Sequence, residues 1–173
     1  MEDIDLLLAF SHTRDTTDEI GTPERLDGWL RAHGLNTDGA DVTPEDVRQA
    51  SHLRAAIASL LRAYLGGTAD PRTQPTIEAV TERAPLRVAV DADGLLVLEA
   101  TGSGVDRALA EIVAALYRCK AAGTSDRLKL CKSCGFAFYD TSKNRSRIWC
   151  DMTTCGSQEK ARAYRQRQSS KGA

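Results

Sequence analysis

The stretch CKSCGFAFYDTSKNRSRIWCDMTTCGSQEKARAYRQRQ, residues 131–168, contains four of the five cysteines of the chain. They form two pairs, C-x2-C at Cys131 and Cys134 and C-x4-C at Cys150 and Cys155. A C-x2-C turn places both sulfurs on one side of the chain, and a second pair completes the four-thiolate shell that structural zinc prefers. The spacing predicts a Zn2+ site with these four ligands. Bound iron, or a disulfide or free-thiol arrangement, is the alternative.

The residues around the two cysteine pairs are aromatic and cationic. Phe136, Phe138 and Trp149 supply apolar bulk to a site that is too small for a core of its own. Residues 143–147 read KNRSR, and residues 159–168 form a helix-favouring run rich in arginine. This combination is typical of nucleic-acid-binding modules. The candidate contacts are Lys143, Arg145, Arg147, Lys160, Arg162, Arg165 and Arg167.

The run FAFYDTSKNRSRIWCDMTTCG, residues 136–156, resembles the CGNR zinc finger, a C-terminal module of bacterial proteins regarded as transcription regulators. The resemblance is carried by the two cysteine pairs and by residues between them: Phe138, Asp140, Ser142, Arg147, Trp149 and Gly156. The tetrapeptide that names the family is Cys-Gly-Asn-Arg. This chain has Ser157 and Gln158 in the last two places, neither of which is expected to bind the metal.

The segment LLLAFSHTRD, residues 6–15, is loosely similar to the ABATE-type domain that precedes this finger in the family. The resemblance implies an N-terminal domain of helices and β structure. It also implies that the whole protein is a transcription regulator.

Charge is distributed unevenly along the chain. Residues 124–173 carry 11 Lys and Arg against 4 Asp and Glu, a net charge of +7, while the rest of the chain carries −8. An acidic body repels polyanions and a basic segment attracts them, so the split favours a polyanionic partner for the C-terminal part. No apolar run approaches the length of a membrane helix, and the acidic N-terminus does not read as a signal peptide. We therefore expect a cytoplasmic protein without a membrane partner, in a compartment where cysteines stay reduced.

Helix signals dominate residues 1–123. Thr22-Pro23 and Thr43-Pro44 each place an N-cap before a proline at the first helical position, and the two helices end near Gly34 and Gly66. Residues 4–14 fit a helix or a buried strand, and residues 76–83 fit a short helix. Residues 86–98 alternate around Asp93-Gly94, which predicts a β-hairpin.

A final N-terminal helix is predicted from about Val105, after a loop at residues 101–104. That loop lacks the residues of a phosphate-binding loop, and we expect Ser103 and Asp106 to form a capping box. The helix places Cys119 on its apolar face, so we expect a buried thiol and not a fifth ligand. Residues 121–125 are the candidate linker.

The predicted fold class is α+β, mainly helical. It consists of an N-terminal helical domain with a β-hairpin, residues 1–123, and a small four-cysteine zinc-finger module with a basic C-terminal helix, residues 124–173. Two functions of different kinds fit this organisation. The first is a DNA-binding transcription regulator whose N-terminal domain senses an unknown small-molecule effector or forms a homodimer. The sequence does not distinguish DNA from RNA as the nucleic-acid partner.

The second function is an enzyme or small-ligand-binding protein in which the finger is only a structural clip. No Ser-His-Asp, Cys-His or paired-carboxylate arrangement supports catalysis, and the three histidines, at positions 12, 33 and 52, are scattered. We therefore predict a regulator without catalytic residues.

Overall fold

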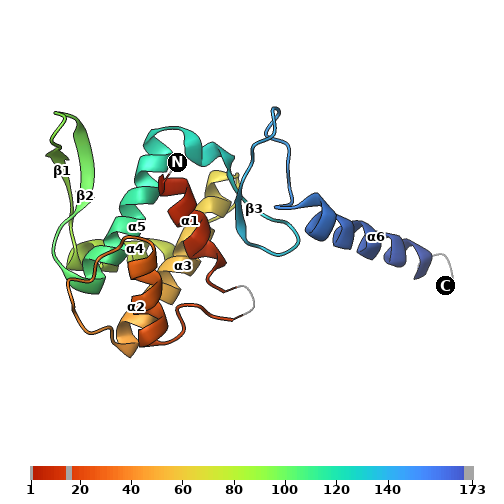
Figure 1. The fold of residues 1–173 in the computed structure, drawn as a ribbon. Helices are drawn as coiled ribbons and strands as arrows, with labels where there is room; N and C mark the ends of the chain where they lie inside the picture. Colours follow the sequence, from red (N-terminus) through yellow and green to blue (C-terminus); the bar gives the residue numbers. More distant parts are fainter. Residues whose placement is uncertain (1, 15–16, 170–173) are drawn as a thin grey trace.

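The computed structural model describes residues 2–14 and 17–169 (Figure 1). The elements, in order, are α1 (Glu2–His12), α2 (Pro23–Ala32), α3 (Pro44–Tyr64), α4 (Thr73–Arg83), β1 (Leu86–Val90), β2 (Leu96–Ala100), α5 (Gly104–Ala121), η1 (Thr124–Arg127), β3 (Leu128–Leu130), β4 (Ala137–Tyr139), η2 (Met152–Gly156) and α6 (Ser157–Ser169). The α+β, mainly helical class is confirmed. None of the helices in the described ranges has the length and apolarity that crossing a bilayer requires.

The helix boundaries follow the predicted caps closely. The Thr22 hydroxyl accepts from the backbone N–H of Arg25, and Thr43 and Asp46 form a reciprocal capping box. The apolar segment near the N-terminus, which periodicity left undecided, is helix α1. The capping box expected before α5 is wrong: the Ser103 side chain makes no cap hydrogen bond, although Ser103 is the N-cap residue.

The core lies around α5, which packs against α1, α3 and α4. Leu109 and Ile112 of α5 and Leu53 of α3 are fully buried in it. The predicted hairpin is present, with β1 and β2 paired antiparallel from Leu86 opposite Ala100 to Val90 opposite Leu96. This hairpin stands at one side of the helices, and α6 extends away from the opposite side (Figure 1).

The β3–β4 hairpin belongs to the same core as the N-terminal helices. Leu128 and Ala137 are buried in the main hydrophobic cluster, and the hairpin contacts α1 and α3. The boundary between residues 123 and 124 stays a prediction, and the ends of the two predicted domains at residues 1 and 170–173 lie outside the described residues. The structure shows that apolar packing continues across this boundary.

Candidate metal centre and nucleic-acid surface

The four predicted ligands meet at one point. The sulfur atoms of Cys131, Cys134, Cys150 and Cys155 all lie within 4.8 Å of one another. Cys150 Sγ is 3.7 Å from Cys134 Sγ and 3.6 Å from Cys155 Sγ. A tetrahedral ion with metal–sulfur bonds of about 2.3 Å places its ligands about 3.8 Å apart, so the spacing fits such an ion. All four cysteines are free thiols, which disagrees with the disulfide alternative.

Backbone geometry positions the first pair at the end of β3. The Cys131 N–H donates to the Phe136 carbonyl at 2.8 Å, and the Gly135 N–H donates to the Cys131 carbonyl at 2.9 Å. Gly135 has φ of 79°, a left-handed conformation that glycine adopts without strain. The Lys132 N–H donates to the Ile148 carbonyl at 2.9 Å, which ties this turn to the segment that carries the second pair.

The second pair lies at the start of the C-terminal helix. Asp151 is the N-cap of η2, and its carboxylate accepts from the backbone N–H groups of Thr153 at 2.8 Å and Thr154 at 2.7 Å. The side-chain hydrogen bond from Thr153 is the largest cause that lowers the pKa of Asp151 to about 2. Cys155 follows in the same helical turn, which places its sulfur beside that of Cys150.

The electrostatics of the cluster suit a bound cation. Burial raises the pKa of the Cys131 thiol, but hydrogen bonds from the backbone around Cys134, Cys150 and Ser133 outweigh burial and lower it to about 6. Burial, followed by the neighbouring thiols, raises the pKa of Cys150 well above its ordinary value. Four thiolates at this spacing repel one another unless a positive ion lies among them. The donor set therefore fits a metal site, with zinc as the most plausible ion.

A buried ion pair holds the loop between the two cysteine pairs. Asp140 is fully buried, and its carboxylate accepts from Lys129 Nζ at 2.7 Å and from the Ser142 backbone N–H at 2.9 Å. The Arg147 N–H donates to the same carboxylate at 3.0 Å. Burial raises the pKa of Asp140, but the hydrogen bond from Lys129 and those from Ser142 outweigh it and hold this pKa below its ordinary value. The loop is thereby closed over the β3–β4 hairpin.

The finger has a small apolar cluster beside the metal ligands. Phe138, Cys131 and Cys155 are buried together, and Trp149 packs against them. Phe136 instead points toward the N-terminal domain, where its ring meets the His12 ring edge-on with centroids 5.3 Å apart. Cys119 is buried in the main core, away from the metal cluster, as expected of an apolar residue.

Two polar contacts join α1 to the finger. His12 Nε2 lies 2.8 Å from the Ala137 carbonyl oxygen, and the Ala137 N–H donates to Ser11 Oγ at 3.1 Å. Sequence patterns do not indicate this role for His12, because its partner is 125 residues away. The finger is therefore held against the N-terminal helices by hydrogen bonds as well as by its shared core.

The seven candidate nucleic-acid residues divide into a loop group and a helix group. Lys143 and Arg145 are exposed in the loop, and Arg145 lies 3.9 Å from Asp126. Arg147 is half-buried; its guanidinium lies over Phe138 and donates to the Cys150 carbonyl. Arg147 therefore supports the metal loop directly. The helix group, all exposed on α6, is Lys160, Arg162, Arg165 and Arg167.

Comparison with known protein families now places the chain. The profile of the family described as "CGNR zinc finger" matches residues 127–168. The profile of the ABATE family, described as "Putative stress-induced transcription regulator", matches residues 5–122. The chain belongs to the ABATE family. A comparison with curated proteins gave no significant match.

This ABATE-family chain accommodates the two departures from the CGNR tetrapeptide at the first turn of α6. The Ser157 hydroxyl donates to the Met152 carbonyl at 3.1 Å, and Gln158 is exposed. Gly156, which the chain shares with the tetrapeptide, leaves little room for a side chain, because an added Cβ would lie 3.1 Å from the Met152 sulfur and 3.5 Å from the Trp149 ring. The metal ligands do not depend on either replaced residue.

Proposed function

We propose that this ABATE-family protein is a DNA-binding transcription regulator that holds one zinc ion with Cys131, Cys134, Cys150 and Cys155. The observation that carries the proposal is the position of α6. This helix begins two residues after Cys155, extends away from the body of the protein, and has four exposed cationic side chains (Figure 1). A cationic helix fixed at its base by a metal site suits binding in a DNA groove with phosphates on both sides.

The zinc ion has a structural role in this proposal. Four protein thiolates fill a tetrahedral shell, which leaves no position for a water or substrate molecule. Four thiolates around a divalent ion leave a formal charge of −2, which the cations of the finger moderate. We propose that the protein is not an enzyme and that it works in the cytoplasm, where cysteines remain available to a metal ion.

The histidines also favour a role other than catalysis. His12 contacts the finger backbone, and His33 stacks on Trp29 with Nδ1 2.8 Å from the Trp29 carbonyl oxygen. His52 lies in a groove between helices, and none of the three is within a cluster of metal-binding residues in the described part of the chain. Among the described residues, these three histidines give no support to the enzyme form of the alternative, in which the finger is only a structural clip.

The β1–β2 hairpin supports homodimerisation as a function of the N-terminal domain. Val88, Val90 and Leu96 lie on one face of the hairpin, and their exposed fractions are 68%, 64% and 78%. Exposed apolar patches of roughly a few hundred Å2 mark interaction sites, and an isolated two-stranded hairpin is only marginally stable. A second copy presents the same face about a two-fold axis, so both hairpins would be covered at once. A dimer would also present two α6 helices to two half-sites on DNA.

The experiment that tests DNA binding is a salt titration with a matched control. Replacing Arg162 and Arg165 together by Gln should reduce the slope of log K against log salt by up to about 2, since each phosphate contact contributes roughly 0.9. Arg48→Gln is the control: Arg48 is as exposed as Arg162 and pairs with an acid three residues earlier, but it lies on α3. Equal slopes for the double variant and the wild type would show that α6 does not contact the phosphates.

A further inference from the structure

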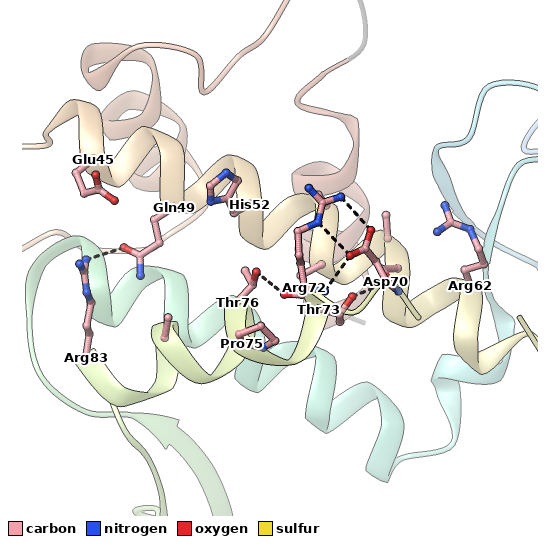
Figure 2. Close-up of a pocket in the computed structure, with 15 residues that line it drawn as sticks. Glu45, Gln49, His52, Arg62, Asp70, Arg72, Thr73, Pro75, Thr76 and Arg83 are labelled. Carbon is pink, nitrogen blue, oxygen red and sulfur yellow. Dashed lines mark hydrogen bonds and ion pairs between the residues drawn. The ribbon is translucent and has the colours of Figure 1, made fainter. Parts of the chain in front are cut away.

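A groove between α3 and α4 forms a cavity of about 670 Å3 on the N-terminal domain (Figure 2). This volume is within the range of small-molecule sites, roughly 300–1,000 Å3. Gln49, Ser59 and Thr73 are buried at its base, with exposed fractions of 8%, 4% and 4%. The groove is separate from the metal site.

Small side chains keep the groove open. Ala55, Ala56 and Ala58 of α3 face Ala79 of α4 across it, so the two helices pack without filling the space. The base is held rigid by hydrogen bonds: Thr73 Oγ1 donates to Ser59 Oγ at 2.7 Å, and Ser59 Oγ also accepts from the Asp70 N–H at 2.8 Å. A groove of this kind is preformed and needs no large rearrangement to accept a ligand.

The charged residues of the groove leave one positive charge in excess. Arg62, Arg72 and Arg83 line it together with Glu45 and Asp70, which gives a formal charge of +1 with His52 neutral. Figure 2 shows Arg72 directed at Asp70; its Nε and Nη2 atoms lie 3.1 Å and 3.0 Å from the two carboxylate oxygens. Glu45 is paired with Arg48, outside the groove.

Arg62 is the cation of the groove whose guanidinium is not engaged in a hydrogen bond or salt bridge among the described residues, although its charge, after the hydrogen bonds from Arg72, helps to lower the pKa of Asp70. Its guanidinium makes no hydrogen bond or ion pair with any residue in 2–14 or 17–169, whereas Arg83 donates to the Gln49 amide oxygen at 3.0 Å. Figure 2 shows Arg62 at the same end of the groove as Asp70 and Arg72, with Arg83 at the other end. A planar guanidinium with free donors suits a carboxylate, which it can bind through two hydrogen bonds.

We propose that this groove binds a small organic monoanion, a carboxylate on an apolar body, and that this ligand is the effector of the regulator. The carboxylate pairs with Arg62, and the apolar body lies over the alanines of α3 and α4. The excess of a single positive charge favours a monoanion over a phosphate ester, which would add a second negative charge. The assignment as effector rests on the proposed regulator function, but the binding site itself does not.

The position of α3 connects the groove to the finger. Residues of α3 line the groove from Glu45 to Arg62, and the same helix contacts β3 and η1, the segments that lead into the metal site. Arg83 also lies 3.5 Å from Asp106 at the start of α5. A ligand that changes the packing of α4 on α3 therefore acts on elements that support the finger.

The test is an NMR titration of the zinc-loaded, full-length protein with sodium benzoate at constant ionic strength. Benzoate should shift backbone amides of α3 and α4 saturably with a Kd below about 10 mM, and benzamide, its neutral analogue, should bind at least about tenfold more weakly. Arg62→Gln should weaken benzoate binding at least about tenfold, while Arg48→Gln, on α3 outside the groove, leaves it unchanged. Ala79→Phe should also abolish binding, because it fills the groove from an exposed position on α4.

Three results would overturn the site: no saturable shifts with benzoate, equal affinity for benzamide, or unchanged affinity in Arg62→Gln. DNA binding at low salt is measured on the same preparation to keep the two proposals apart. Benzoate binding without DNA binding supports the groove and contradicts the regulator. DNA binding without benzoate binding contradicts the groove alone.

Discussion

Replacing Leu128 by alanine tests whether the finger and the N-terminal helices share one core. Leu128 is fully buried in the main hydrophobic cluster, although it lies on β3, only three residues before the first metal ligand. Truncation to alanine removes three carbon groups, which costs about 2.4 kcal/mol at 0.8 kcal/mol per group. The cavity left behind in a close-packed core adds about 1 kcal/mol or more. We expect Leu128→Ala to lower the free energy of unfolding by about 3–4 kcal/mol.

The assay is urea unfolding of the zinc-loaded protein, followed by helical circular dichroism. Because the lost packing is against α1 and α3, the variant should shift the transition of the N-terminal helices and not only that of the finger. Leu130→Ala is the control: this leucine is half-buried at the edge of the same cluster and should cost only about 1 kcal/mol. A loss below about 1 kcal/mol for Leu128→Ala, or lost hydrogen-exchange protection confined to residues 131–168, would refute a shared core.

The remaining predictions concern the metal ligands, the ion pair between Arg54 and Asp18, and the dimer. Cys150→Ser should release the metal and unfold the metal loop. Cys119→Ala should retain the metal and lower the free energy of unfolding by about 1 kcal/mol. Atomic absorption measures the zinc content of both variants, and a full zinc content in Cys150→Ser would contradict the ligand set. The hydrogen bond from Arg54 lowers the pKa of Asp18. The wild type should therefore have a higher free energy of unfolding than Asp18→Asn above about pH 4, and this difference should be lost as the pH falls further. Urea unfolding at several pH values checks it, and a difference that does not change with pH would exclude this contribution. Leu96→Lys should shift sedimentation from dimer to monomer, and a monomeric wild type would exclude the hairpin interface.

Most of the fold could be predicted because the residues that start and end its helices lie close together in the sequence. Thr43, Pro44 and Asp46 lie within four residues of one another, so their capping box is readable from the sequence. The metal cluster was equally predictable, since cysteine spacing reports directly on chelation geometry. The expected capping box at Ser103 is absent, and Asp106 instead lies 3.5 Å from Arg83, 23 residues earlier, a contact that sequence spacing does not encode.

The parts that the sequence did not predict depend on contacts between distant segments. His12 meets the Ala137 carbonyl across 125 residues, and nothing in its neighbourhood distinguishes it from a surface histidine. Lys129 and Asp140 form a buried pair only because the fold brings β3 and the loop after β4 together, which local sequence patterns do not show. The groove between α3 and α4 was hidden for a similar reason: alanines in a helix predict helix formation but do not show that a space remains beside them.

Binding of DNA by a zinc-dependent finger can be measured with and without the metal. Fluorescence anisotropy of a labelled duplex is recorded at low and increasing salt, with the zinc-loaded protein and with the same protein after chelation. The zinc-loaded protein should bind at low salt and bind less tightly as salt rises, with roughly −0.9 in log–log slope per phosphate contact. Removal of zinc should abolish binding. Absence of binding by the zinc-loaded protein even at low salt, or binding that is unchanged by chelation, would contradict it.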